Sequence, residues 1–175
     1  MIQVFQIERF KLSEILEIFK ESFHTNFFPM IIPIASDHAG YSGKETVKKI
    51  LEEMGHTPVD FGTHNEDSVD YPDFAVQVAE RVNSGEHEQG ILVCGSGQGV
   101  CMTANKYPKV RAGLVYSVKS AEMTRLHNNA NIMCLPGREL NESQLHDIIK
   151  SWLNTKFEGG RHERRVNKIE TLTQK

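Results

Sequence analysis

Cysteine is scarce in this chain, and the three cysteines present show no paired spacing. An odd number of cysteines without a CxxC motif argues against a secreted disulfide framework and against a structural zinc site. We therefore expect reduced thiols in a cytoplasmic protein. The apolar runs are only as long as strands, which excludes a membrane-spanning helix. A net charge of −3 leaves no basic field that would recruit nucleic acid or an anionic membrane.

Glycine is absent before Gly40, whereas six of the nine phenylalanines precede Met30. The composition therefore changes near Met30, and we divide the chain into an N-terminal extension, residues 1–29, and a domain over residues 30–175. Apolar residues within 8–23 recur at a helical period, which predicts an amphipathic helix in the extension. This segment either docks on the domain or precedes Met30 as the true first residue of the protein. The alternative is a helix that binds a partner.

From residue 30 onward, short apolar segments alternate with helical segments. Such alternation predicts right-handed βαβ units, and hence a three-layer α/β/α, Rossmann-like domain with a five-stranded parallel sheet. Two helices carry capping signals, Ser42 with Glu45 and Asn141 with Gln144. The expected strands are 30–35, 57–61, 89–94, 110–116 and 131–135, and the expected helices are 42–54, 72–83, 99–106, 118–128 and 141–153.

A glycine-rich loop with the sequence Cys-Gly-Ser-Gly-Gln-Gly follows the third expected strand. Its glycines let backbone N–H groups turn toward one point at the start of a helix, which suits a phosphate or an oxyanion. The spacing departs from the dinucleotide fingerprint GxGxxG, and no acidic residue follows the next strand, so a dinucleotide site is disfavoured. Cys94 is either a reactive thiolate facing a helix N-terminus or a buried cysteine that ends an apolar strand. We assign Cys101 and Cys134 to the core.

Other polar groups lie where strands and helices end, and each has a structural and a functional interpretation. Asp37 and His38 follow the first strand, either as an Asx turn or helix cap or as part of a site. His127 ends a helix, either as a C-terminal cap or as an acid/base group near neutral pH. Arg161 and Arg165 are four residues apart in a basic tail, which is either a solvated end or a phosphate clamp.

Taken together, these motifs resemble the ribose-5-phosphate isomerase B family, which includes the galactose-6-phosphate isomerase subunits and allose-6-phosphate isomerase. The motifs occur in the family's order and spacing over about residues 30–170, and the family's usual start aligns with Met30. Each motif alone is weak, but the set is specific. The matching stretches are 36–40, 70–72, 91–99, 104–106, 111–112, 125–128 and 158–165.

The resemblance implies an enzyme of the pentose phosphate pathway. It would interconvert ribose 5-phosphate and ribulose 5-phosphate, an aldose–ketose isomerisation, through a cis-enediolate and without a metal or cofactor. It implies that Cys94 is the base that moves a proton between C1 and C2, and that His127 opens the furanose ring. The enediolate oxygens would be held by Ser96 and by the backbone N–H groups of Gly95, Gly97, Gln98 and Gly99.

The resemblance also implies a site completed by a second subunit. Family members form dimers or tetramers, so we expect a homodimer or homotetramer whose tail arginines serve a neighbouring site. Asp37 and Asn128 would bind sugar hydroxyls. The phosphate would be bound by His38, Arg138, Arg161 and Arg165. Two alternatives stay open, namely a six-carbon substrate such as allose 6-phosphate and a non-catalytic sugar-phosphate-binding module.

Overall fold

The computed structural model describes residues 29–173, in which strands and helices alternate along the chain. The helix predicted within 8–23 lies outside the described residues. The strands are β1 (Ile31–Ser36), β2 (Thr57–Asp60), β3 (Gly90–Cys94), β4 (Ala112–Leu114) and β5 (Ile132–Pro136). The helices are the 3-10 helix η1 (His38–Gly40), α2 (Tyr41–Glu53), α3 (Tyr71–Ser84), α4 (Gln98–Ala104), α5 (Val118–Asn128), α6 (Glu142–Asn154) and α7 (Arg161–Thr173).

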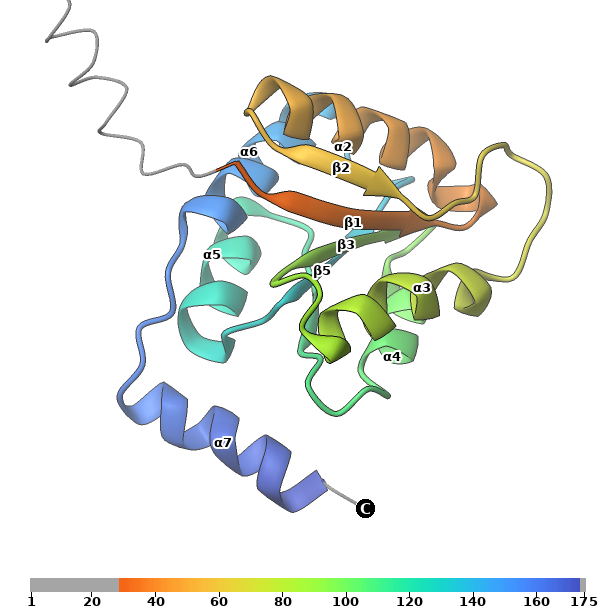
Figure 1. The fold of residues 1–175 in the computed structure, drawn as a ribbon. Coiled ribbons are helices and arrows are strands. Elements are labelled where there is room, and N and C mark those ends of the chain that lie inside the picture. The colour runs from red at the N-terminus through yellow and green to blue at the C-terminus, as the bar shows by residue number, and fades with distance from the viewer. Residues whose placement is uncertain (1–28, 174–175) are drawn as a thin grey trace, which may run out of the picture.

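The five strands form one parallel sheet in the order β2-β1-β3-β5-β4, which confirms the predicted architecture. Helices α2, α5 and α6 cover one face of this sheet, and α3 and α4 cover the other (Figure 1). The first face buries Val47, Ile148 and Trp152, and the second buries Val78 and Val100. Each fully buried aliphatic side chain contributes about 1.5–3 kcal/mol relative to an exposed one.

The strand order places the carboxyl ends of β1 and β3 side by side. The chain runs outward from β1 to β2 and then returns to β3 to build the other half of the sheet, so the direction of winding reverses between β1 and β3. Open α/β sheets bind their ligands at such a switch point, outside the carboxyl ends of the strands. The loops that follow β1 and β3 are therefore positioned to form a site.

One predicted helix start is wrong. Ser42 does not cap α2, because that helix begins at Tyr41, directly after η1. The side chain that caps this region belongs to Asp37, whose Oδ1 accepts the N–H of Gly40 at 2.8 Å. The other predicted capping box, at the start of α6, is confirmed.

A fully buried lysine, Lys44, ties α2 to β2. Its Nζ lies 2.7 and 2.5 Å from the two carboxylate oxygens of Asp60, and Nζ of Lys48 lies 2.8 Å from one of them. Burial acts to raise the pKa of Asp60, but hydrogen bonds from Lys44, Lys48 and the N–H of Gly62 outweigh it and lower that pKa. Gly62 in turn accepts the N–H of Ser36 at 2.6 Å. The ion network thus holds the loop after β2 against the end of β1.

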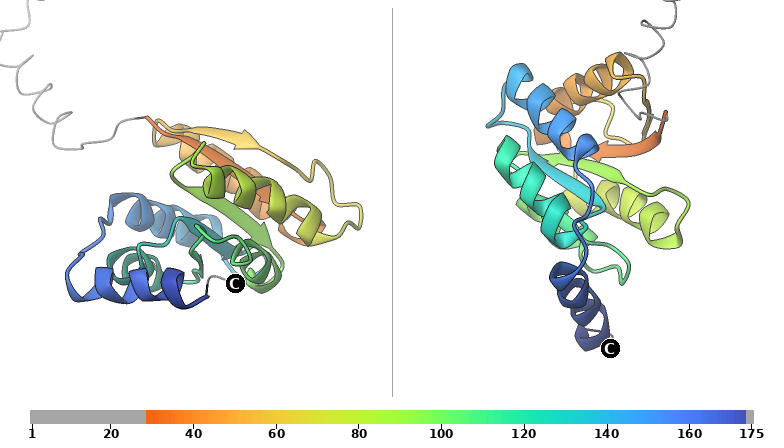
Figure 2. Two further views of the ribbon diagram at one scale, coloured as in Figure 1. Left: turned by 60° about the horizontal axis from the view of Figure 1, so that its bottom comes forward. Right: turned by 90° about the vertical axis from the view of Figure 1, so that its left-hand side faces the viewer.

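Helix α7 leaves the three layers and extends from the body of the domain (Figures 1 and 2). It is a helix of 13 residues, and it includes Arg161 and Arg165 of the basic tail. It contacts α5, and an ion pair of 2.7 Å joins its Glu170 to Arg111. Its apolar side chains Ile169 and Leu172 are exposed. Within residues 29–173, no helix is both long and apolar enough to cross a membrane.

Candidate active site

A cleft of about 470 Å³ opens at the switch point of the sheet, where β1, β3 and β5 end. Its wall is assembled from the loops after these three strands and from the first turns of α3 and α4, so residues far apart in the sequence meet there. The lining consists of Asp37, His38, Ala39, Tyr71, Cys94, Gly95, Ser96, Gly99, Arg138 and Glu139.

Cys94 is the last residue of β3, and it is buried at the base of this cleft. The N–H of Gly97 donates to its Sγ, with an N–S distance of 3.1 Å. Gly97 has φ of 73°, and a Cβ there would lie 2.5 Å from Cδ1 of Leu114, so the loop can turn back on the sulfur only with glycine. Cys94 is therefore both a buried strand end and a group that faces a ligand cleft.

Asp37 and His38 reach the cleft through the turn after β1. Asp37 has the capping role predicted for it and also lines the cleft. Nδ1 of His38 lies 3.2 Å from both the N and the O of Val69, so the loop before α3 fixes the imidazole ring. The turn after β1 therefore places a carboxylate and an imidazole in the same wall of the cleft.

The loops after β1, β3 and β5 are packed backbone against backbone. A Cβ on Gly40 would lie 2.4 Å from the carbonyl oxygen of Val93. The N–H of Arg138 donates to the carbonyl of Gly95 at 3.3 Å. This packing sets the exposed Arg138 side chain at the rim beside the glycine-rich loop, where a guanidinium can bind an anionic group of a ligand.

The predicted site residues fall into two separate groups. Those that line the cleft are Asp37, His38, Cys94, Gly95, Ser96, Gly99 and Arg138. Gly97 and Gln98 belong to the same glycine-rich loop without being part of the lining. The second group comes from the end of α5 and from α7, and consists of His127, Asn128, Arg161 and Arg165. The described residues of one chain therefore do not bring all the predicted residues together.

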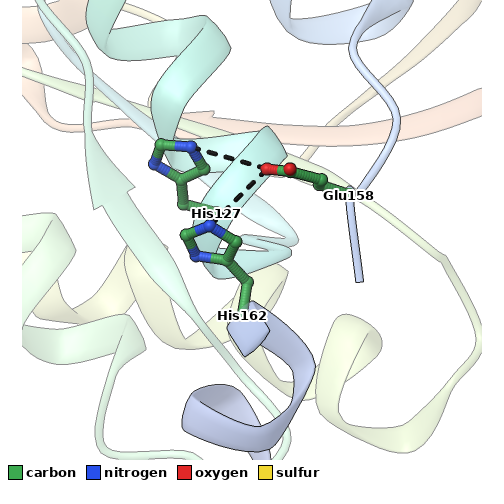
Figure 3. A group of neighbouring side chains, drawn as sticks. All are labelled: His127, Glu158 and His162. Carbon is green, nitrogen blue, oxygen red and sulfur yellow. Dashed lines mark ion pairs between the residues drawn. The ribbon is translucent and has the colours of Figure 1, made fainter. Parts of the chain in front are cut away.

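His127 is the centre of the second group. Its ring stacks on that of His162, with centroids 4.1 Å apart and planes 2° from parallel (Figure 3). Oε2 of Glu158 lies 3.8 Å from Nε2 of His127 and 3.5 Å from Nε2 of His162. Nε of Arg161 donates to Nε2 of His162 at 3.2 Å. Burial, His127, Arg161 and Arg165 lower the pKa of His162, against the opposite effect of Glu158.

Asn128 lies next to His127 in the sequence but lines a different hollow. This hollow has a volume of about 1100 Å³ and lies between α7 and the segment that leads into β4. Arg111, Ile169 and Glu170 line it as well. Asn128 is exposed there, so it is available to a molecule that approaches this side of the domain.

Sequence reasoning missed four functional candidates. Tyr71 and Glu139 line the cleft, and the ring of Tyr71 would lie 2.9 Å from a Cβ on Gly99. Tyr71 lies within a stretch that matches the family, but a tyrosine at this position does not by itself predict a role in binding or catalysis. The other two candidates, Glu158 and His162, are within a matching stretch too, and only the packing of α7 against α5 places them beside His127.

The remaining cysteines belong to the hydrophobic cluster that also contains Cys94. Cys134 is in the core as predicted. Cys101 is half-buried at the edge of the same core cluster, where its Sγ lies 3.4 Å from the carbonyl oxygen of Ala112. Burial raises the pKa of Cys134 well above its usual value. Neither Cys101 nor Cys134 lines the cleft, which leaves Cys94 as the thiol that faces it.

The cleft lies at the switch point of a parallel sheet and holds a buried thiol beside a glycine-rich loop. This arrangement is typical of an α/β protein that binds a small ligand. The family model for Ribose/Galactose Isomerase matches residues 32–169. Ribose-5-phosphate isomerase B of Escherichia coli (strain K12) is 36% identical over 144 residues, which cover 82% of this chain and 97% of that protein.

Solved structures agree with this match. The structure of ribose-5-phosphate isomerase B from Clostridium thermocellum has a TM-score of 0.80 and 45% identity, and the match covers 82% of this chain and 97% of that one. The enzyme from Mycoplasma genitalium, with bound ribulose-5-phosphate, has a TM-score of 0.77 and 43% identity over 81% of this chain and 95% of that one. The chain therefore belongs to the ribose/galactose isomerase family. It is a sugar-phosphate aldose–ketose isomerase.

Proposed function

We propose that this chain interconverts ribose 5-phosphate and ribulose 5-phosphate through a cis-enediolate, as a cytoplasmic enzyme of the pentose phosphate pathway that uses no metal or cofactor. The observation that carries the proposal is the cleft that Cys94, Ser96 and Arg138 line together. The relatives named ribose-5-phosphate isomerase B support the choice of substrate, and one of them binds ribulose 5-phosphate.

Cys94 is the proposed base. Its thiolate would accept the N–H of Gly97, the donor that already faces the sulfur at 3.1 Å. The thiolate takes the C2 proton of the open-chain aldose and returns it to C1, while the proton of the C2 hydroxyl moves to O1. The enediolate between these steps carries a negative charge, which needs hydrogen-bond donors because the C2 proton is only weakly acidic. Ser96 and the loop N–H groups would supply them, at about 3 kcal/mol for each well-placed donor.

The second group of residues would supply the remaining steps of the reaction. His127 would open the furanose ring by transferring a proton to the ring oxygen, a task that suits an imidazole near neutral pH. Asn128 would join Asp37 in binding sugar hydroxyls. The phosphate would be bound by His38, Arg138, Arg161 and Arg165.

Because the two groups lie apart in one chain, we propose that a second copy completes each cleft, in a homodimer or a larger assembly. The position of α7 supports this proposal, since the helix extends from its own domain with exposed apolar side chains. An arginine on such a helix can reach a cleft on a neighbour. The phosphate would then hold C1 and C2 in place through binding energy remote from the reacting atoms.

The decisive experiment measures conversion of ribose 5-phosphate to ribulose 5-phosphate by the full chain in EDTA. Cys94→Ala is expected to lose about 10²–10⁴-fold in kcat, the usual contribution of proton transfer by a positioned base. Binding of the sugar phosphate should survive in this variant. Cys101→Ala is the matched control, because it removes a thiol outside the cleft lining.

Retained turnover in Cys94→Ala would contradict the assigned base. Turnover that disappears in EDTA and returns with a metal would contradict the metal-free mechanism. A higher kcat/KM for allose 6-phosphate than for ribose 5-phosphate would move the substrate to the six-carbon sugars while leaving the chemistry in place.

A further inference from the structure

The group formed by His127, Glu158 and His162 has the composition of a metal site. Two imidazole nitrogens and one carboxylate oxygen approach one another, and the three ligand atoms all lie within 4.8 Å (Figure 3). Two histidines with one glutamate is a ligand set that holds Zn²⁺ in proteins and leaves a fourth position open. Softer thiolate ligands are not involved, so Co²⁺ and Ni²⁺ suit the same set.

The two distances from Glu158 to the histidines need only a small contraction to bind such an ion. Zn–N and Zn–O bonds of about 2.0–2.2 Å place tetrahedral ligand atoms about 3.3 Å apart. The carboxylate oxygen of Glu158 already lies 3.8 Å from His127 Nε2 and 3.5 Å from His162 Nε2. The two parallel rings must tilt toward each other to aim their nitrogens at one point, which rotation about the side-chain bonds allows.

The backbone around these ligands is already ordered. The N–H of Glu158 donates to the carbonyl of Leu126 at 3.0 Å, one residue before His127. His162 is four residues beyond Glu158, in the first turn of α7, and its side chain is buried. Glu158 itself is half-exposed, so an ion has access from solvent. Metal binding here would require rotation of side chains but no rearrangement of the chain.

One contact opposes metal binding. Nε of Arg161 donates to the same nitrogen of His162 that would coordinate the ion, so the guanidinium must move away. The positive charges of Arg161 and Arg165 also repel a cation. The affinity should therefore lie below that of structural zinc sites, in a range where the ion binds and leaves reversibly.

We propose that His127, Glu158 and His162 form a binding site for a divalent transition-metal ion of the zinc class, and that an ion bound there inhibits the enzyme. Coordination takes the lone pair of His127 Nε2, so the imidazole can no longer exchange a proton with the ring oxygen of the sugar. The inhibitory part rests on the function proposed above for His127. The binding part rests on the ligand geometry alone.

The binding test adds Co²⁺ to the metal-free full chain and follows its visible absorption, with Zn²⁺ as the competitor. Tetrahedral coordination should give strong absorption bands without the charge-transfer band of a thiolate ligand. Glu158→Gln and His162→Gln should each weaken binding by at least about tenfold, because even partners outside the first coordination shell change affinity by about 10–100-fold. His146→Gln is the matched control, since it removes another histidine that lies beside a carboxylate, with Nδ1 3.3 Å from Asp147.

Equal binding by the wild type and the two ligand variants would overturn the site. So would a thiolate band that disappears in Cys94→Ala, since that result would place the ion in the cleft. Circular dichroism of each variant checks that the fold is intact, which matters most for His162→Gln because the His162 side chain is buried.

The inhibition test measures turnover as the site fills with Zn²⁺. Turnover of the wild type should fall in step with occupancy and return on addition of EDTA, while the two ligand variants should need at least about tenfold more zinc for the same fractional loss. Full occupancy with unchanged turnover would overturn the inhibitory role. A chain that binds zinc at this site but never isomerises a sugar phosphate would instead contradict the proposed function and leave the metal site standing.

Discussion

Asp60→Asn is expected to destabilise the domain, because it removes the main partner of the buried charge of Lys44. Lys44 is 0% exposed, and its other carboxylate neighbour is Glu45 at 3.2 Å, which is partly exposed to solvent. Breaking a buried ion pair by removing one partner costs about 3–5 kcal/mol. Since Glu45 retains part of the compensation, we expect a loss near the lower limit, about 3 kcal/mol.

Lys44→Met is the informative comparison. It removes the buried charge itself and leaves Asp60 paired with Lys48 at 2.8 Å and with the N–H of Gly62 at 2.9 Å. The expected loss is only about 1 kcal/mol, because the remaining carboxylate keeps Lys48 and the N–H of Gly62 as partners and no buried charge is left unpaired. Urea unfolding at pH 7 and one fixed protein concentration measures both variants. Asp67→Asn, at an exposed position, should stay within about 0.5 kcal/mol of the wild type.

The pH dependence provides a second check on the same network. The lowered pKa of Asp60 means that the folded state favours the charged carboxylate. Its contribution to stability is fully present above about pH 4, the usual pKa of an unfolded Asp, and is lost as the pH falls through the lower folded value. The difference in stability between the wild type and Asp60→Asn should therefore shrink below about pH 4. A Lys44→Met loss equal to that of Asp60→Asn, or a difference that persists in acid, would refute this reasoning.

Three further predictions concern the loop, the core and the extension. Gly97→Ala should lose about 1–2 kcal/mol of stability and much of the turnover, because φ at this position is 73° and the new Cβ would clash with Leu114. Urea unfolding measures the stability and steady-state kinetics measure the turnover. Trp152→Phe should lose about 2 kcal/mol in urea unfolding, because its buried Nε1–H donates to Gln89 at 2.6 Å. Removal of residues 1–29 should leave turnover within a few-fold, and a collapse of activity or assembly would show that the extension is structural.

The elements that the sequence predicted well are those with local signals. The helix expected at 118–128 is observed with the same bounds, because Ser117 caps its start and Asn129 adopts the left-handed conformation at its end. The strand ends and the switch-point cleft follow from βαβ connectivity, which depends on the order of elements along the chain. The predicted cap of α2 was wrong because the 3-10 helix η1, which Asp37 caps, runs directly into α2 and leaves Gly40 at its start without a side-chain cap.

The features that could not be predicted depend on contacts between distant segments. The burial of Lys44 depends on Asp60, which is 16 residues away on another element. The group around His127 forms only because α7 packs near the end of α5, and no residue pattern in either helix indicates that contact. The division of the predicted site residues into two places has the same origin, since the direction of α7 is set by tertiary packing rather than by its amphipathic pattern.

The close approach of Gly40 to the carbonyl of Val93 means that the backbone beside the cleft and the rim of the cleft differ in how much change they tolerate. Backbone meets backbone between η1 and β3, so these two segments cannot be brought closer and are held in one arrangement. The rim is different, because Tyr71, Arg138 and Glu139 are exposed side chains that can be replaced without moving any strand. In this scaffold the backbone beside Cys94 is therefore held by the sheet, while the shape of the rim is open to change one side chain at a time.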